Sequence, residues 1–262
     1  MTASISKGIV LAAGRGTRLY PLTLAIPKEM IRVGRVPVIE HAINVLKAGG
    51  IRDILVIVGF KKEAIMDYLG SGERFGVNIY YRVQEEPKGT AHAVYYGKDF
   101  IGNEDFVVIY GDNYFKPYDS IKEIINFHRE KEADATLVLH EVKDPTRFGI
   151  AKINNTDKSV IDVIEKPTLD EAEPYRIGNS YLSIAGLIIL KSVIFDFIER
   201  TKPGKNNEIW LTDSIELLRR NGYKVYGFIF KGKRCDIGTF ESLEEADRLE
   251  QKEEKNNACP QQ

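Results

Sequence analysis

The sequence predicts an α/β protein with a Rossmann-like, doubly wound, mixed but mainly parallel sheet and helices on both faces, in three layers (α/β/α). Short apolar runs at residues 8–12, 54–58 and 106–110 have the length of strands buried on both faces. Segments with apolar residues at helical spacing separate these runs, and strands joined through helices pair in parallel. The chain has 262 residues, of which 43% are hydrophobic, so it can form one large domain with a substantial core.

The first half alternates strands and helices. After the strand at 8–12, apolar residues at positions 39, 42, 43 and 46 share one face of a helix, which the glycines at 49 and 50 end. A strand at 54–58, a short helix at 65–69, a strand at 77–83, a helix at 91–100 and a strand at 106–110 follow. Ligands of such sheets bind beyond the carboxyl ends of the strands, so we expect a site there.

The second half has a less regular pattern. A helix is expected around 121–128, and strands at 135–141, 150–153 and 160–165, with Asn154-Asn155 as a tight hairpin turn between the last two. A long apolar strand covers residues 181–190, a helix covers 211–218, and Asn221-Gly222 leads into a strand at 225–230. From residue 241 the chain reads as a charged helix, and residues 255–262 as a frayed or disordered tail.

A glycine-rich turn with three cations follows the first strand. Gly14 and Gly16 let the backbone approach an anion closely. The cationic side chains are Arg15, Arg18 and Lys28. Backbone N–H groups and guanidinium groups together can hold several phosphates. The run is neither a Walker loop nor a dinucleotide fingerprint, because no Gly-Lys-Ser/Thr closes it and Leu19 replaces the third glycine.

Composition narrows the possible partners and the compartment. The net charge is −1, and no basic stripe with interleaved aromatic residues suggests nucleic-acid binding. No apolar stretch approaches the ~20 residues of a membrane span. The two cysteines, Cys235 and Cys259, form no C-x-x-C pair, so we expect free thiols, a reducing compartment and a cytoplasmic protein. The four histidines and two cysteines show no zinc spacing.

Two aspartates are candidate magnesium ligands. Asp112 follows the strand at 106–110, and Asp236 begins a tight Asp-Ile-Gly-Thr turn. Mg²⁺ prefers oxygen ligands and uses one or two carboxylates. Each aspartate could equally be a turn former when taken alone. We expect both to lie at exposed strand ends.

Residues 8–30 resemble the LAxGxGTRLxPLT…PK signature of the sugar-1-phosphate nucleotidylyltransferases, and the resemblance extends over roughly residues 8–245. It implies that Asp112 and Asp236 hold Mg²⁺ and that Arg18 and Lys28 stabilise the leaving pyrophosphate. The residues implied to bind the nucleotide are Leu11, Ala13, Gly14, Gly16, Thr17, Gln84 and Gly89. Those implied to bind the sugar phosphate are Gly149, Glu165 and Lys166.

The residues named by the resemblance have suitable chemistry. Gln84 offers a donor and an acceptor that match the edge of uracil or thymine, and Gly89 would let the backbone approach the base. Lys166 would supply a point charge for the sugar phosphate. Glu208, Thr212 and Asp213 resemble another family segment at a helix start. His92 could approach the base, but a histidine at a helix start is the plainer interpretation.

The resemblance implies transfer of a nucleotidyl group from a pyrimidine nucleoside triphosphate to a sugar 1-phosphate. Residues 17–23 and 236–239 look like glucose-1-phosphate thymidylyltransferases, whereas residues 25–30 and 86–89 look like UTP–glucose-1-phosphate uridylyltransferases. We favour dTTP with α-D-glucose 1-phosphate, giving dTDP-glucose and pyrophosphate, and keep UTP as the alternative. A non-catalytic sugar-nucleotide sensor on the same fold is the alternative of another class.

The predicted organisation follows from these assignments. Residues 1–245 form a single nucleotidylyltransferase domain, with a nucleotide-binding half at about 1–115 and a sugar-binding half at about 116–245. Residues 246–262 form the charged helix end and tail. The expected partners are the nucleoside triphosphate and the sugar 1-phosphate, without nucleic acid or membrane, and a homo-oligomer is compatible with the sequence.

Overall fold

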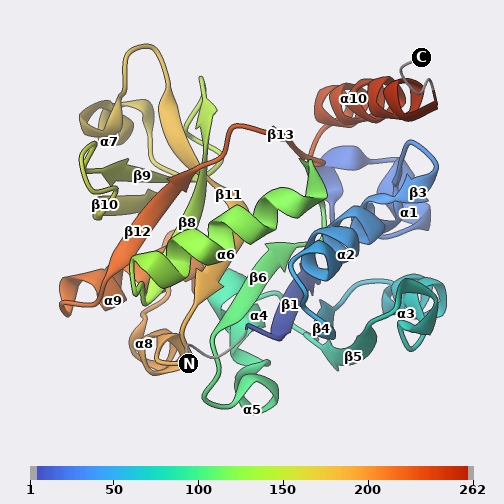
Figure 1. Cartoon of the computed structure of the whole chain (residues 1–262), viewed down its shortest axis with the longest axis horizontal. Coiled ribbons are helices and arrows are strands. Elements are labelled where there is room, and N and C mark those ends of the chain that lie inside the picture. The colour runs from blue at the N-terminus through green and yellow to red at the C-terminus, as the bar shows by residue number, and fades with distance from the viewer. Residues whose placement is uncertain (1–4, 259–262) are drawn as a thin grey trace.

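The central sheet of this computed structural model, which describes residues 5–258, is mixed and lies between two helical layers, as predicted (Figure 1). Its strands are β1 (Lys7–Ala12), β4 (Asp53–Val58), β5 (Asn78–Val83), β6 (Phe106–Tyr110), β8 (Ala135–Val142), β9 (Gly149–Ile153), β10 (Val160–Glu165), β11 (Tyr181–Leu190) and β12 (Val225–Ile229). The order is β10-β9-β11-β6-β1-β4-β5, and β8 pairs with both β11 and β12. β1 pairs in parallel with β4 and β6, whereas β11 is antiparallel to β6 and so joins the two halves of the chain in one sheet.

Helices cover both faces of the sheet. The helices are α1 (Leu22–Ala25), α2 (Val38–Ala48), α3 (Lys62–Leu69), α4 (Thr90–Tyr95), α5 (Lys98–Ile101), α6 (Ile121–Glu130), α7 (Leu169–Ala172), α8 (Ile194–Arg200), α9 (Leu211–Arg220) and α10 (Phe240–Ala258). The short 3₁₀ turns are η1 (Thr17–Leu19), η2 (Lys28–Met30), η3 (Glu73–Phe75), η4 (Tyr118–Ser120), η5 (Glu173–Tyr175) and η6 (Lys205–Asn207). Apolar side chains of α2, α3 and α6 pack in one core, and those of α4, α8 and α9 pack in a second core on the opposite face.

Two small antiparallel ribbons stand apart from the central sheet, and the sequence analysis did not identify either. One pairs β2 (Arg32–Val33) with β3 (Val36–Pro37), and the other pairs β7 (Asn113–Lys116) with β13 (Lys233–Asp236). Tyr114 and Cys235 of the second ribbon pack in a third apolar cluster, which also contains Ala246 of α10. Pairing in the β7–β13 ribbon is long-range, so periodicity within either segment could not predict it.

Two local predictions were wrong. The helix expected at 91–100 is divided into α4 and α5 at Gly97, a poor helix former. A Cβ at Gly97 would lie 2.4 Å from Ile9 Cδ1, so the glycine permits close contact with β1. β9 and β10 do form an antiparallel pair, but residues 154–159 connect them in place of a two-residue turn. The Asn154 side chain accepts a hydrogen bond from the Thr156 N–H (2.8 Å), which stabilises this wider turn.

The C-terminal helix extends further than expected. α10 continues to Ala258, past Lys255, where we expected the chain to fray. Residues 259–262, which include Cys259, lie outside the described residues. Cys235 is a buried free thiol. Within residues 5–258, no helix combines the length and the apolar character needed to span a membrane.

Two histidines, His41 and His128, are buried in the interior of the protein. His41 Nε2 donates to the Val33 carbonyl oxygen (3.0 Å), and its Nδ1 accepts from the Tyr118 hydroxyl (2.6 Å). His128 is bonded to Thr136 Oγ1 through Nδ1 (2.8 Å), and burial lowers its pKa to about 4. Both rings therefore form hydrogen bonds with buried polar atoms, although His128 Nε2 has no hydrogen-bond partner among the described residues.

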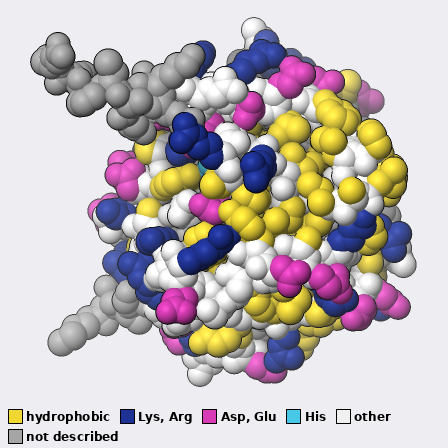
Figure 2. All heavy atoms as spheres, turned by 90° about the vertical axis from the view of Figure 1, so that its right-hand side faces the viewer, with side chains coloured by type: hydrophobic (Ala, Val, Ile, Leu, Met, Phe, Trp, Pro, Cys, Tyr) yellow, Lys and Arg dark blue, Asp and Glu magenta, His cyan; other side chains and the backbone are white. Residues whose placement is uncertain are grey.

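The segment after the glycine-rich turn exposes apolar side chains. Leu22 and Leu24 are among the exposed large hydrophobic residues of the protein. Figure 2 shows one face of the molecule, on which hydrophobic side chains lie among charged ones. Thr23, between them, is fully buried and donates from Oγ1 to the Gly16 carbonyl oxygen (2.8 Å). This hydrogen bond, rather than apolar packing by the two leucines, anchors α1 to the turn.

Candidate active site

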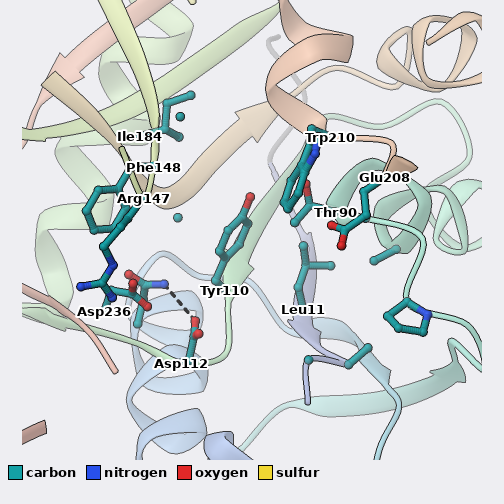
Figure 3. A pocket seen from close by; sticks show the side chains of 18 of the residues that line it. Leu11, Thr90, Tyr110, Asp112, Arg147, Phe148, Ile184, Glu208, Trp210 and Asp236 are labelled. Carbon is teal, nitrogen blue, oxygen red and sulfur yellow. Dashed lines mark hydrogen bonds between the residues drawn. The ribbon is translucent and has the colours of Figure 1, made fainter. Parts of the chain in front are cut away.

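A cavity of about 480 Å³ lies beyond the carboxyl ends of β1 and β6, and residues of both halves of the chain line it (Figure 3). Of the residues to which the resemblance assigned a catalytic, nucleotide-binding or sugar-phosphate-binding role, all but Gly16 line it: Leu11, Ala13, Gly14, Thr17, Arg18, Lys28, Gln84, Gly89, Asp112, Gly149, Glu165, Lys166 and Asp236. Glu208 and Thr212 of the helix-start segment line it as well, whereas Asp213 does not. Predicted residues far apart in the sequence are thus brought to one place. Their position agrees with the rule that α/β sheets bind ligands at the carboxyl ends of their strands.

The glycines of the first turn make room for Lys28. A Cβ at Gly14 would lie 3.1 Å from Lys28 Cε, and one at Gly16 would lie 3.0 Å from Lys28 Cβ. Gly16 also has φ +63°, a conformation that L side chains rarely adopt. Gly16 therefore shapes the turn without lining the cavity.

Lys28 forms an ion pair with Asp112. Its ammonium contacts Asp112 Oδ2 and lies 3.9 Å from Glu29 Oε1. Burial alone would lower the pKa of Lys28, but attraction to Asp112 and Glu29 outweighs burial and raises it. A fully charged lysine is thus fixed at the carboxyl end of β6.

The β7–β13 ribbon brings the second aspartate beside the first. Asp236 is paired with Asn113, and the Ile237 N–H donates to the Asp112 carbonyl oxygen (2.9 Å). The Asn113 amide donates to Asp112 Oδ1 (3.1 Å), as the dashed line in Figure 3 shows. Burial, followed by repulsion from Asp112, raises the pKa of Asp236. The expectation that both aspartates lie at exposed strand ends was wrong, because Asp112 is 6% exposed and Asp236 is partly buried.

The aspartate pair fits Mg²⁺. Two neighbouring carboxylates raise each other's electrostatic energy, and a hard divalent cation would relieve this repulsion. Among the described residues, no group of three or more His, Cys, Asp and Glu side chains could hold a metal. Two carboxylates match the preference of Mg²⁺ for few protein ligands alongside water and phosphate oxygens.

A histidine orients the predicted base-binding amide. Gln84, 5% exposed, donates from Nε2 to His92 Nδ1 (2.9 Å). Burial, followed by repulsion from Lys88, lowers the pKa of His92, so the neutral ring can accept this bond. The sequence analysis noted that His92 could approach the base but favoured an ordinary histidine at a helix start. Its spacing from Gln84 crosses a loop, so no periodic pattern could identify the contact.

Gly89 approaches backbone rather than open space. Its φ is +102°, and a Cβ would lie 2.3 Å from the Ile209 carbonyl oxygen. The Ile209 N–H donates to the Lys88 carbonyl oxygen (2.8 Å), and the Ala91 N–H donates to the Ile209 carbonyl oxygen (3.0 Å). The loop that carries Gly89 is therefore joined to the segment before α9, in the second half of the chain.

A second glycine permits a buried carboxylate contact. Thr212 Oγ1 donates to Glu165 Oε2 (2.6 Å), and a Cβ at Gly149 would lie 2.7 Å from that Thr212 oxygen. Burial raises the pKa of Glu165, although the bond from Thr212 opposes this shift. Gly149 thus allows β9, β10 and α9 to meet around Glu165.

Several cavity residues were not predicted. One is Tyr110, which lies between the aspartate pair and Trp210 in Figure 3. Another is Arg234 of β13, which donates from Nε to Asn113 Oδ1 (2.9 Å). Trp210 is the only tryptophan of the sequence. Tyr110 could have been found as the last residue of a predicted strand, whereas Arg234 depends on the unpredicted ribbon.

Comparison with known proteins identifies the family. The nucleotidyl transferase family matches residues 7–253. The low-salt glycan biosynthesis nucleotidyltransferase Agl11 of Haloferax volcanii is 36% identical over 93% of this chain, and a glucose-1-phosphate thymidylyltransferase of Neisseria meningitidis is 34% identical over 92%. The chain spans 65% of the length of the first relative and 81% of the second. The protein belongs to the nucleotidyl transferase family.

A solved structure agrees in fold. A UDP-glucose pyrophosphorylase complexed with UDP-glucose superposes with a TM-score of 0.85 at 29% identity, covering 95% of this chain and 99% of the other. The mixed α/β fold is therefore shared over nearly the whole chain.

We predict that Gly89→Ala destabilises the protein more than Gly50→Ala. Both positions have positive φ, which costs about 1–3 kcal/mol for other residues, but only Gly89 has backbone within reach of the added Cβ. The free energy of unfolding, from urea denaturation, measures the difference. Equal losses in the two variants would contradict the proposed close approach to Ile209.

We also predict that Glu29→Gln changes the pH dependence of stability. Glu29 is 1% exposed and its Oε2 has no hydrogen-bond partner among the described residues. Burial raises the pKa of Glu29 to about 7. The folded state then holds a proton that the unfolded state releases above its ordinary pKa of about 4.3, so wild-type stability falls as the pH rises towards about 7.

The measurement for Glu29→Gln is the melting temperature between about pH 4 and about pH 8. We expect variant and wild type to agree near about pH 4 and the variant to be increasingly more stable as the pH rises towards about 7. Glu123→Gln, on an exposed face of α6, is the matched control and should show no such trend. A difference from wild type that is independent of pH would show that Glu29 is ionised throughout.

Proposed function

We propose that this protein is a sugar-1-phosphate nucleotidylyltransferase that uses a pyrimidine nucleoside triphosphate. The observation that carries the proposal is the single cavity in which the glycine-rich turn, Lys28 and the aspartate pair face Glu165 and Lys166. The first group suits a triphosphate, and the second suits a sugar phosphate. On this proposal, residues 1–115 supply the nucleotide side and residues 116–245 the sugar side.

The proposed reaction is an in-line displacement. An oxygen of the sugar phosphate attacks the α-phosphorus of the triphosphate, a new P–O bond forms, and the bond to the β-phosphate breaks with release of pyrophosphate. The attacking phosphate is already ionised at neutral pH, so no side chain has to remove a proton. Catalysis then rests on positioning and charge stabilisation.

Each side chain has a part in this scheme. Lys166 holds the attacking phosphate, while Arg18 and Lys28 stabilise the charge that develops on pyrophosphate. A Cβ at Gly238 would lie 3.0 Å from Arg18 Nη2, so the Asp-Ile-Gly-Thr turn leaves space for that guanidinium. Asp112 and Asp236 would hold Mg²⁺, which when bound would neutralise phosphate charge.

The relatives and the predicted base site support the proposed substrate pair. Relatives and solved neighbours include both a glucose-1-phosphate thymidylyltransferase and a UDP-glucose pyrophosphorylase. Gln84 presents an amide to an edge that thymine and uracil share. We favour dTTP with α-D-glucose 1-phosphate, and UTP is the second candidate. We also propose a cytoplasmic location, which the free, buried Cys235 supports.

A non-catalytic sugar-nucleotide sensor on this fold is the less favoured function. A sensor would need to bind its ligand but would not need metal ligands. The convergence of Asp112 and Asp236, at an electrostatic cost that raises the pKa of Asp236, favours catalysis.

Substrate profiling tests the proposed function. We expect pyrophosphate release with α-D-glucose 1-phosphate and either dTTP or UTP, with kcat/KM values within about 100-fold of each other, because a methyl contact contributes only about 1–3 kcal/mol. CTP, ATP and GTP should be far weaker, since they leave the polar groups of the base site unpaired. A preference for GTP or CTP would refute the base assignment, and binding without any turnover would favour the sensor.

Replacing the aspartates tests the metal site. Asp112→Asn and Asp236→Asn should each lower kcat by on the order of 100-fold or more. Their melting temperatures should differ, because Asp112→Asn breaks the ion pair with Lys28 whereas Asp236→Asn removes a repelled carboxylate. Asp67→Asn, exposed on α3, is the control. Near-wild-type turnover of Asp112→Asn at saturating Mg²⁺ would exclude the assignment.

A further inference from the structure

The ammonium of Lys166 rests on the face of an indole. Lys166 Nζ lies 3.7 Å from the centroid of the Trp210 ring. Lys166 directly follows β10, and Trp210 caps the N-terminus of α9, so the contact links two separate elements. Trp210 is 8% exposed, and both residues line the cavity. At this distance a cation–π attraction is expected.

The surrounding hydrogen bonds fix both partners. Trp210 Nε1 donates to the Lys205 carbonyl oxygen (3.0 Å), and Lys205 Nζ donates to the Lys166 carbonyl oxygen (2.7 Å). The Lys166 N–H donates to the Phe148 carbonyl oxygen (3.0 Å), and Lys166 has φ +43°. A left-handed conformation is uncommon for lysine and persists only where neighbouring contacts determine it. The backbone of Lys166 and the indole plane are therefore held in one arrangement.

The two lysines of the cavity are held by different chemistry. Lys28 is paired with the carboxylate of Asp112, whereas no carboxylate of the described residues lies within ion-pair distance of Lys166. Glu165, its neighbour, directs Oε2 to the Thr212 hydroxyl. An aromatic face attracts an ammonium without neutralising it, and more weakly than a buried carboxylate would. An arriving phosphate can therefore pair with the ammonium while the indole face continues to hold it.

We propose that Trp210 is a positioning residue that holds the Lys166 ammonium at the sugar-phosphate side of the cavity while the incoming phosphate pairs with it. This inference rests on the proposed function. The role proposed for Trp210 does not use its indole N–H, because that group already donates to the Lys205 carbonyl oxygen. The role depends on the π face alone.

A pair of variants isolates the π face. Trp210→Phe and Trp210→Leu both lose the bond to Lys205, but only phenylalanine keeps an aromatic face. We expect Trp210→Leu to raise KM for α-D-glucose 1-phosphate by about 2- to 30-fold, with Trp210→Phe between Trp210→Leu and wild type. KM for the triphosphate should change less than 2-fold, by about the error of the assay, because the contact is with Lys166. Equal KM values for the two variants, or an effect mainly on the triphosphate, would overturn the proposal.

Fluorescence tests the contact without turnover. Because the sequence has one tryptophan, emission excited at a wavelength selective for indole reports on Trp210 alone. We expect Lys166→Met to shift the emission of the ligand-free protein, and inorganic phosphate or α-D-glucose 1-phosphate to shift wild-type emission in the same direction. Lys202→Met, which removes an exposed ammonium that does not line the cavity, should leave the phosphate response in place. Melting temperatures establish that the variants are folded.

The outcomes separate the two proposals. If no substrate pair is turned over but Lys166→Met and phosphate both shift the emission, the proposed activity fails and the contact stands. If turnover is observed but Lys166→Met leaves the emission unchanged, the role of Trp210 is refuted and the activity stands.

Discussion

The proximity of two like charges, the buried Asp112 and the partly buried Asp236, is the constraint on which the rest of the site depends. Asp112 and Asp236 come from distant segments, and their backbones are joined directly by the hydrogen bond from Ile237 N–H to the Asp112 carbonyl. Such a pair is costly without compensation. Lys28, Arg234 and Arg18 supply the compensating charge, and each of them lowers the pKa that burial and repulsion raise at Asp236. This charge cluster is therefore held in place by three segments: the glycine-rich turn, the β7–β13 ribbon and η2.

The two halves of the chain meet through backbone contacts that require glycine. Gly89 lies against the Ile209 carbonyl, and Gly149 leaves room for Thr212 beside Glu165. In both cases the partner belongs to the segment that begins α9. This segment thus contacts the base loop and the proposed sugar-phosphate side at once. A displacement of α9 would move residues on both sides of the cavity, because the contacts are between rigid backbone and short side chains.

The charge arrangement also explains why the cavity can receive anions in a protein with a net charge of −1. Lys28 is kept charged by carboxylates, and Lys166 is kept available by an aromatic ring. The first arrangement fixes a charged lysine beside the aspartates, and the second leaves a cation available to pair with a phosphate group. Local cations, rather than a global field, thus provide the attraction for phosphate groups.

The sequence by itself determined the fold class, most strands and helices, and the residues of the phosphate turn, because these depend on periodicity and on short runs of local chemistry. It also indicated Asp112, Asp236, Glu165 and Lys166 through a family resemblance, although their roles remain proposals. Only the tertiary structure decided the β7–β13 ribbon, the burial of Asp112, and the contacts of His92 with Gln84 and of Trp210 with Lys166. Each of these depends on pairing between segments remote in sequence, and no local pattern records which remote partner a side chain will meet.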